Sequence, residues 1–312
     1  RETMDEYVIQ TTGLTRCFGP RAVVSDLDLA VPRGCVFGFV GRNGSGKTTT
    51  IRMLLGLLPP TRGEARVLGE DSRCLSGETR ARIGYMAEGH PVYEWMRVGE
   101  CGRFQAACFR TWNDGVFGAV LEHFRLGPDR KVRDLSRGER AGLCLALTLA
   151  PEPELLILDD PALGLDPVAR RSLLEAMIFV TRDSDRTIFF SSHLLGDVER
   201  VADWVAVLDR GVLRACCTLA TFRRRISRFV LAWDGTPPAE IPPLPGLVHV
   251  FRAGHELQLT VANADADVRA SLGSLGASRV EEVPIGLEEA FIDYLGDRGE
   301  KNLLLSDLEV TP

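Results

Sequence analysis

The stretch GRNGSGKTT, residues 41–49, constrains this chain more than any other. It fits the pattern G-x-x-x-x-G-K-[ST], in which glycines let successive backbone N–H groups turn inward around an anion. A helix that begins near Lys47 adds the positive end of its dipole, and the Lys47 ammonium and Thr48 hydroxyl are expected to reach phosphates and Mg²⁺. The apolar run 36–40 predicts a buried strand before the loop, and residues 49–58 predict a helix after it. These features predict a Walker A phosphate loop, whose expected nucleotide contacts are Gly41, Arg42, Asn43, Gly44, Ser45, Gly46, Lys47, Thr48 and Thr49.

Length and composition set the broad class. A chain of 312 residues, 45% of them apolar, can bury a large core and is expected to divide into two domains. The net charge of −6, without a long basic block, does not favour nucleic acid as a partner. The longest nearly uninterrupted apolar run, Ala141–Ala150, is too short to cross a bilayer, and the first residues show no signal-peptide pattern, so a soluble polypeptide is expected. The eight cysteines show no C-x-x-C spacing, which favours buried, reduced thiols over metal ligands or disulfides.

The segments around the loop predict a mixed architecture. Short alternating apolar runs before it (7–10, 22–24 and 27–31) predict antiparallel strands. Residues 92–126 carry apolar side chains at helical spacing, which predicts an all-helical insert. Residues 134–139, DLSRGE, open a further apolar helix that runs to Leu149. A serine and a glycine at this place are also explained by simple capping of that helix.

A second polar cluster follows two buried strands. Residues 155–158, LLIL, end in Asp159 and Asp160. In an α/β sheet, such a strand delivers a carboxylate beside the phosphate loop, where it can bind a metal. Strands also often end in Asp at a turn, but downstream of a Walker A loop this pattern predicts a Walker B segment. The run 187–191 predicts another buried strand and ends just before His193. A lone histidine is more often structural, but at this end of the sheet it is a candidate phosphate contact.

Together these segments resemble the ATP-binding subunits of ABC transporters, from about Tyr7 to Leu213. The most specific element is Leu-Ser-x-Gly at 135–138, between the Walker A and Walker B segments, which ordinary P-loop enzymes lack. The resemblance implies an α/β fold: a P-loop NTPase core with an antiparallel β subdomain, a helical signature subdomain and a small C-terminal α+β domain. It assigns Phe18 to adenine stacking, Glu88 to the place of the Q-loop glutamine, Ser136 and Gly138 to the signature, Asp159 to Mg²⁺, Asp166 to the D-loop dimer contact and His193 to the switch position. Taken alone, Phe18 is better explained as a core residue.

The resemblance also implies ligands and partners. Two such subunits meet head to tail, so that each ATP with its Mg²⁺ lies between one subunit's Walker A loop and Ser136 and Gly138 of the other. The second subunit is either an identical or a different ATP-binding chain. An integral membrane permease is the other implied partner, which implies a cytoplasmic protein held peripherally at the inner face of the membrane.

Two residues depart from the family's pattern. Asp160 stands where the general base is usually Glu, and Asp is shorter by one C–C bond of about 1.5 Å. Because a misplacement of about 1 Å can cost on the order of 100-fold in rate, turnover is expected to be slow. Glu88 replaces a neutral amide and is expected to bind Mg²⁺ with Thr48 and Asp159, or to orient water. Two functions follow: an ATPase that uses Asp160, His193 and Glu88, or a nucleotide-binding regulatory subunit without appreciable hydrolysis.

A third function, a soluble ABC ATPase acting on ribosomes or DNA, is disfavoured. Such proteins usually carry two cassettes or long coiled coils, whereas this chain has one Walker A loop, no extended heptads and an acidic balance. The segment 90–96, HPVYEWM, places aromatic and apolar groups where the family docks its permease. A groove containing Trp95 and Met96 would suit a docked helix, although core packing explains these residues nearly as well.

The predicted domains are an ATP-binding domain at 4–218, with its helical subdomain at about 89–150, an α+β accessory domain at 219–297 and a tail at 298–312. Composition changes beyond about Ala220, where strands at 228–233, 248–251, 256–261 and 279–283 and helices at 265–275 and 287–295 are expected. This part is more loosely similar to the C-terminal appendage of ABC-2 exporter ATPases, with 284–291 as its closing motif. Export is inferred from that similarity alone.

Overall fold

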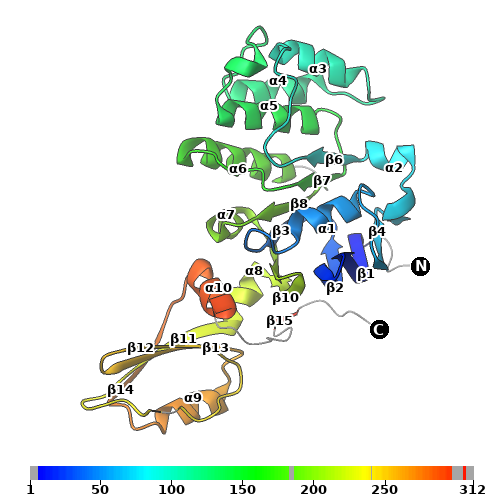
Figure 1. Ribbon diagram of the computed structural model, residues 1–312. Helices are drawn as coiled ribbons and strands as arrows, with labels where there is room; N and C mark the ends of the chain where they lie inside the picture. Colours follow the sequence, from blue (N-terminus) through cyan, green and yellow to red (C-terminus); the bar gives the residue numbers. More distant parts are fainter. Residues whose placement is uncertain (1–5, 183–185, 240, 297–304, 307–312) are drawn as a thin grey trace. The chain divides into compact units, whose positions relative to one another are not determined.

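The structure, a computed structural model, describes residues 6–182, 186–239, 241–296 and 305–306 (Figure 1). Its chain forms two compact units, the first ending at Leu213 and the second beginning at Arg214. This division falls within strand β10 (Val212–Thr218). The functional assignment of the two parts, with a boundary at 218, stays a prediction.

A parallel sheet forms the centre of the first unit. Strand β3 pairs in parallel with β8 on one side and with β9 on the other, and β7 lies between β8 and β6. Every residue of β3 and β7 is buried, as expected for strands covered on both faces, which is why they read as continuous apolar runs. The bounds are β3 Val36–Val40, β6 Ile83–Met86, β7 Leu155–Leu158, β8 Thr187–Ser192 and β9 Trp204–Asp209.

A second, antiparallel sheet precedes and follows the phosphate loop in the sequence. Its order is β2-β1-β4-β5. The bounds are β1 Tyr7–Phe18, β2 Arg21–Pro32, β4 Arg62–Val67 and β5 Glu70–Asp71. Strands β1 and β2 are longer than the short apolar runs predicted, because register shifts carry the pairing across polar residues such as Asp26.

Three helices gather at one end of the first unit, α3 (Val98–Ala106), α4 (Asp114–His123) and α5 (Arg137–Leu149) (Figure 1). The predicted helical insert begins six residues too early, at Val92, because the chain before α3 instead bonds to the segment before α5. The Val132 N–H donates to the Met96 carbonyl oxygen, and the Val98 N–H donates to that of Arg130. The other helices of this unit are α1 Lys47–Leu54, α2 Gly77–Ala81, α6 Pro167–Arg182 and α7 Leu195–Val201.

The second unit is built on an antiparallel sheet of order β12-β13-β11-β14. Helix α9 contributes Val268 and Leu272 to an apolar core with Phe229 and Leu259 from the sheet. The bounds are α8 Leu219–Arg225, β11 Ile226–Ala232, β12 Leu247–Ala253, β13 Glu256–Ala262, α9 Ala266–Gly273, β14 Arg279–Val283 and α10 Leu287–Gly296. In the tail, left unassigned by the sequence, β15 (Leu305–Ser306) pairs in parallel with β10. The rest of the predicted tail lies outside the described residues.

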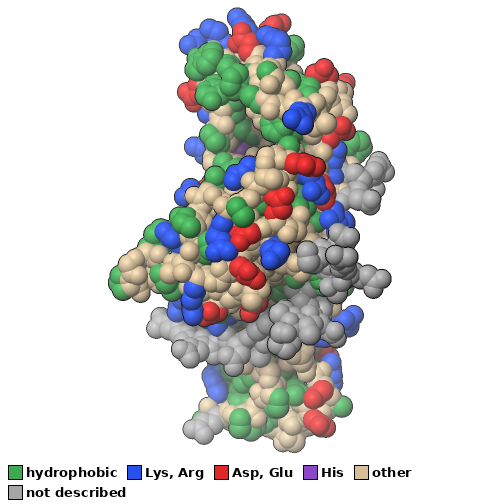
Figure 2. Space-filling model, turned by 90° about the vertical axis from the view of Figure 1, so that its right-hand side faces the viewer, with side chains coloured by type: hydrophobic (Ala, Val, Ile, Leu, Met, Phe, Trp, Pro, Cys, Tyr) green, Lys and Arg blue, Asp and Glu red, His purple; other side chains and the backbone are tan. Residues whose placement is uncertain are grey.

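The eight cysteines differ in their exposure. All eight cysteines are free; Cys35, Cys101, Cys216 and Cys217 are buried, whereas Cys74 and Cys108 are exposed. Burial raises the pKa of Cys35 and of Cys144 to about 12, so these thiols are held protonated. Within the described ranges, no helix combines the length and the apolar character that crossing a membrane requires. Figure 2 shows acidic and basic side chains interspersed on the face that it presents.

Candidate functional site

The phosphate loop connects β3 to α1, and its shape depends on two glycines. Gly46, the residue before α1, has φ of +109°, and a Cβ there would lie 2.7 Å from the Val23 carbonyl oxygen. At Gly41, a Cβ would lie 2.3 Å from the Leu208 carbonyl oxygen. Only glycine fits these two places without displacing backbone. The loop therefore takes the tight form that its sequence pattern predicts.

Lys47 is the buried cation of the loop. Its side chain is among the buried charged groups at 7% exposure, and Nζ donates to the carbonyl oxygens of Gly41 at 2.7 Å and Arg42 at 3.3 Å. Burial lowers the pKa of Lys47, and the nearby carboxylates of Asp160, Asp159 and Glu88 oppose that shift. A positive group thus lies where negative groups of a ligand would be stabilised most strongly, with little water to screen it.

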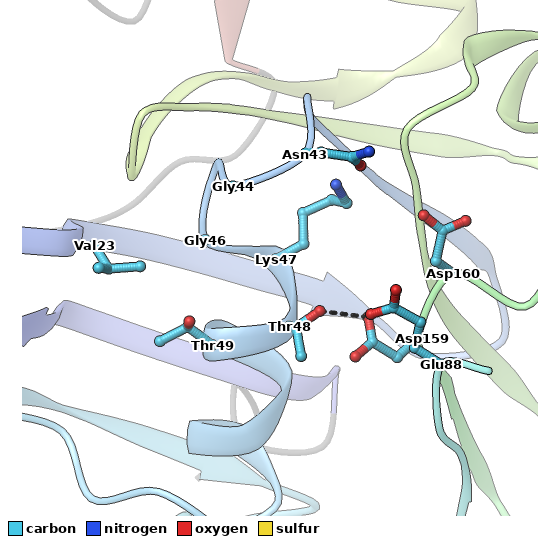
Figure 3. Close-up of a pocket in the computed structure, with 10 residues that line it drawn as sticks. All are labelled: Val23, Asn43, Gly44, Gly46, Lys47, Thr48, Thr49, Glu88, Asp159 and Asp160. Atoms are coloured by element: carbon cyan, nitrogen blue, oxygen red, sulfur yellow. Dashed lines mark hydrogen bonds between the residues drawn. The ribbon is translucent and has the colours of Figure 1, made fainter. Parts of the chain in front are cut away.

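A pocket of about 380 Å³ lies beside the loop. Figure 3 shows the three carboxylates of Glu88, Asp159 and Asp160 across the pocket from α1. Its lining residues are Val23, Asn43, Gly44, Gly46, Lys47, Thr48, Thr49, Glu88, Asp159 and Asp160. Nine of these ten are among the predicted site residues; Val23 was not predicted. Gly41, Arg42 and Ser45 complete the loop without lining the pocket.

The residues around Thr48 fit a magnesium ion. The Thr48 hydroxyl donates to Asp159 Oδ1 at 3.1 Å. Asp159 is 1% exposed, and its Oδ2 has no hydrogen-bond partner among the described residues. Hydroxyl and carboxylate oxygens are suitable ligands for Mg²⁺, which usually takes only one or two carboxylates and completes its shell with phosphates and water. Within the described ranges, no group of three or more His, Cys, Asp and Glu side chains is placed to hold a metal ion by itself.

Asp160 and His193 form a pair at the pocket's edge. His193 Nδ1 lies 2.7 Å from Asp160 Oδ2. Burial raises the pKa of Asp160, and the hydrogen bond from His193 opposes this shift. Asp160 also has φ of +43°, in the left-handed region that residues other than glycine seldom occupy. The pair brings together two residues from the ends of β7 and β8, as expected where neighbouring parallel strands end.

Ser191 was missed in the sequence although it touches both carboxylate residues. Its hydroxyl donates to Asp159 Oδ1 at 2.8 Å and accepts from the Asp160 N–H at 2.9 Å. The side chain is 0% exposed. The available signal was its place two residues before His193, at the carboxyl end of a strand adjacent to β7.

Phe18 lies outside the pocket lining and is not a core residue. It is the last residue of β1 and is 49% exposed, because the hairpin turns there. The Arg16 guanidinium lies over its ring, with 4.6 Å from Cζ to the ring centroid, and donates to the Pro59 carbonyl oxygen. The core interpretation of Phe18 is therefore wrong, whereas its stacking on a base stays a prediction.

The signature residues lie at the start of α5, away from the pocket lining. The Ser136 hydroxyl accepts from the Glu139 N–H at 3.2 Å, and the Glu139 carboxylate accepts from the Ser136 N–H, so Ser136 caps the helix. A Cβ at Gly138 would lie 2.4 Å from that of Ala169, so this glycine lets α5 approach α6 closely. Asp166 in turn caps α6, accepting from the N–H groups of Val168 and Ala169.

The segment proposed for permease docking is split between surface and interior. Tyr93, Trp95 and Phe104 are 53%, 73% and 48% exposed and have ring contacts at 5.7 to 5.9 Å, with Tyr93 between the other two. Met96 is only 7% exposed, because it packs beneath α3 with the Cys101 thiol 3.9 Å from its sulfur. The expected groove wall at Met96 is therefore wrong, and the exposed aromatic patch consists of Tyr93, Trp95 and Phe104.

His90, in the same segment, is a buried link rather than a surface group. It is 4% exposed, and its Nε2 lies 2.8 Å from the Pro161 carbonyl oxygen. Burial lowers its pKa, which favours the neutral ring donating Nε2–H. The segment after Glu88 is thereby joined to the turn after Asp160.

Comparison with known proteins indicates the same family as the sequence motifs do. Residues 24–163 match the family described as ABC transporter. The bacitracin transport ATP-binding protein BcrA of Bacillus licheniformis is 36% identical over 208 residues, which are 66% of this chain and 68% of that protein. The Nod factor export ATP-binding protein I of Rhizobium sp. (strain N33) is 32% identical over 307 residues, which are 96% of this chain and 100% of that protein.

A solved structure described as an ATP binding subunit of an ABC transporter has the same fold. Its TM-score is 0.62 at 28% identity, covering 70% of this chain and 92% of the other. The predicted α/β fold with a P-loop NTPase core is confirmed. The family expected from the motifs is confirmed as well, because a relative above 30% identity matches nearly the whole chain. The chain belongs to the ATP-binding proteins of ABC transporters.

Proposed function

We propose that this chain binds ATP with Mg²⁺, dimerises on it, hydrolyses it and thereby drives a separate membrane permease. The observation that carries the proposal is the buried Lys47 ammonium facing Asp159 and Thr48 within one pocket. The phosphate loop leads into the start of α1, and backbone N–H groups of a glycine-rich loop at a helix start are an arrangement that can hold a triphosphate. Equilibrium binding of a fluorescent ATP analogue, with Lys47→Ala as the negative control, tests the first step.

For hydrolysis, the chain must orient a water molecule and accept its proton. Asp160 and His193 are the groups proposed for this task, since their side chains are already paired at 2.7 Å. Bound Mg²⁺ would neutralise charge developing on the phosphates. Thr48, Asp159 and Glu88 are the residues proposed to hold the ion.

We extend the proposal to a head-to-tail pair of subunits. Ser136 and Gly138 lie outside the pocket lining. Within a single chain, they would therefore not contact a nucleotide bound at the phosphate loop. In the proposed pair, they complete the partner's site, and Asp166 lies at the contact between subunits. Sedimentation of the hydrolysis-deficient variant Asp160→Asn with and without Mg-ATP tests this step; a monomer at saturating ATP contradicts it.

The permease is proposed to contact the exposed aromatic patch of Tyr93, Trp95 and Phe104. Three neighbouring aromatic side chains at 48 to 73% exposure form an apolar surface suited to a partner helix. Co-purification with a membrane protein should be lost in Trp95→Ala. Phe251→Ala is the matched control, because this exposed aromatic residue lies in the second unit. Association that survives Trp95→Ala contradicts this docking surface.

Export and location are proposed from the relatives. The names of two relatives describe bacitracin transport and Nod factor export. The extended match to the second of them includes the C-terminal part of this chain, which supports an exporter with residues 219–297 as an accessory domain. The proposed location is the cytoplasmic face of the membrane, held there by the permease. The identity of the transported compound is left to that permease.

A second candidate is a regulatory subunit that binds ATP with little hydrolysis. The specific observation in its favour is Asp160, whose carboxylate is shorter than the usual Glu and is engaged by His193. Single-turnover hydrolysis by the wild type, Asp160→Asn and Glu88→Gln separates the candidates. An active ATPase should lose rate in Asp160→Asn, whereas equal rates in all three contradict a catalytic role for Asp160 and Glu88. In that case, a partner ATPase with Glu at the position of Asp160 is expected.

A further inference from the structure

We propose that Ser191 is a positioning residue that sets the geometry of the metal carboxylate and of the general base at the same time. The inference rests on the proposed ATPase function and deepens it. Ser191 lies near the end of β8 and is 0% exposed, so its hydroxyl does not touch solvent. Nothing in the Walker A or Walker B patterns designates this residue.

The first bond fixes which oxygen of Asp159 is free. Ser191 donates to Oδ1 at 2.8 Å, and Thr48 donates to the same oxygen at 3.1 Å. Oδ2 is left buried without a partner in the described part of the chain. A hydroxyl group held against one oxygen prevents the carboxylate from rotating, so that the other oxygen keeps its direction. When Thr48 turns to a metal ion, Ser191 is the group that still holds Oδ1.

The second bond fixes the backbone of Asp160. The Asp160 N–H donates to Ser191 Oγ at 2.9 Å. Because an N–H can only donate, the hydroxyl must accept there and give its single proton to Asp159. Asp160 has φ of +43°, a conformation that persists where the surroundings hold it in place. Without the hydroxyl, the buried N–H would lose its partner, and the residue could relax away from His193.

A merely structural role makes a different prediction, and Thr187 provides the comparison. It lies at the other end of β8, is also 0% exposed, and its hydroxyl accepts from the Gly34 N–H at 2.9 Å. Removing the Ser191 hydroxyl leaves the buried Asp160 N–H without its partner, whereas Gly34 is exposed and its N–H can bond to water instead. Thr187→Val therefore serves as the loss of a buried hydroxyl from the same strand, and only the loss of Ser191 should affect the site.

The experiment compares Ser191→Ala with Thr187→Val in the full chain. Measurements are the single-turnover rate, the KM for ATP, and the Mn²⁺ affinity of the complex with a non-hydrolysable ATP analogue, read from the electron paramagnetic resonance signal. We expect Ser191→Ala to lower the rate about 10- to 100-fold with little change in KM, because the misplacement concerns reacting groups. Mn²⁺ binding should weaken in the same variant. Thr187→Val should leave the single-turnover rate and the Mn²⁺ affinity at the wild-type level.

A double variant tests the route through Asp160. If Ser191 acts on the rate by positioning Asp160, adding Ser191→Ala to Asp160→Asn should lower the rate no further, while Mn²⁺ binding still weakens. Wild-type Mn²⁺ and rate values in Ser191→Ala, or equal changes in Thr187→Val, overturn the inference. Failure of the proposed function looks different: the wild type itself would bind no nucleotide or would show no hydrolysis.

Discussion

The phosphate pocket differs in construction from the signature turn, that is, the start of α5 at Ser136 and the start of α6 at Asp166. In the pocket, polar side chains from distant segments bond to one another: Thr48 to Asp159 across 111 residues, and His193 to Asp160 across 33. In the signature turn, Ser136 and Asp166 bond to N–H groups no more than three residues away. The pocket thus depends on contacts between distant segments, whereas the signature turn depends on local hydrogen bonds at the starts of two helices.

The two halves of the proposed site should therefore respond differently to the loss of the second subunit. The pocket is complete in one chain, so its defects should appear in a monomer. The signature turn is shaped by its own helix, and only a second chain would give it a phosphate to contact. Substitutions on the two sides should therefore separate in dimer-dependent and dimer-independent measurements.

The largest expected effect is that of Lys47→Ala in the pocket. Loss of a charged hydrogen-bond donor of about 3 kcal/mol should weaken ATP binding about 100-fold. Isothermal titration with the monomer measures it. Lys131→Ala, at the other described lysine, is the control and should bind as the wild type does. If Lys47→Ala bound ATP as tightly as the wild type does, the pocket would not be the ATP-binding site.

Next comes Asp160→Glu, which lengthens the carboxylate. If reach limits hydrolysis, the single-turnover rate should rise roughly 10- to 100-fold. The backbone should oppose the change: with φ of +43°, residue 160 suits Asp better than Glu, and the strain costs about 1 kcal/mol. Thermal unfolding should show this loss. A slower enzyme with unchanged stability would contradict both parts of the expectation.

Gly138→Ala should act on the signature side without any nucleotide. The new Cβ would lie 2.4 Å from that of Ala169, and such overpacking costs about 1 to 3 kcal/mol. Urea unfolding of the chain measures this. Gly196→Ala is the control within α7, because nothing lies within 4 Å of its Cβ position. Because Gly196 lies in the first turn of α7, that variant should change the free energy of unfolding by no more than about 1 kcal/mol. If Gly138→Ala proved neutral, the close approach of α5 and α6 would not be what requires glycine.

The smallest expected effect is that of Ser136→Ala, which removes a helix cap of about 1 kcal/mol. Ser76→Ala removes the equivalent cap of α2, where the hydroxyl accepts from the Thr79 N–H at 3.1 Å. Both variants should lose similar stability, but only Ser136→Ala should also weaken ATP-dependent dimerisation. Dimerisation equally affected in both would reduce the signature serine to a structural cap.

The local part of this site could be predicted from the sequence. The loop, the strand ending in Asp159 and the strand before His193 were predictable because each depends on neighbouring residues and on apolar runs. The α/β fold followed from the order of these elements. Family resemblance added the identity of the signature, whose residues look in isolation like ordinary capping residues.

What the sequence could not supply are contacts between segments. Nothing in the local sequence of Ser191 and His90 indicates their partners, which lie 32 and 71 residues away. Exposure was equally hidden: Met96 and Trp95 are adjacent and both apolar, yet one is buried and the other is open. Such differences depend on which side of a non-helical segment faces α3, and no periodic pattern records that choice.

The exposure of Trp95 also gives the molecule a spectroscopic property. Of the four tryptophans, Trp95 is the exposed one at 73%, whereas Trp112, Trp204 and Trp233 are half-buried. Its indole therefore emits from a wet environment, and covering it would shift that emission to shorter wavelength. The chain thus has a fluorophore of its own at the aromatic patch, far along the sequence from the phosphate loop, so occupancy of that surface can be followed by light without attaching a label.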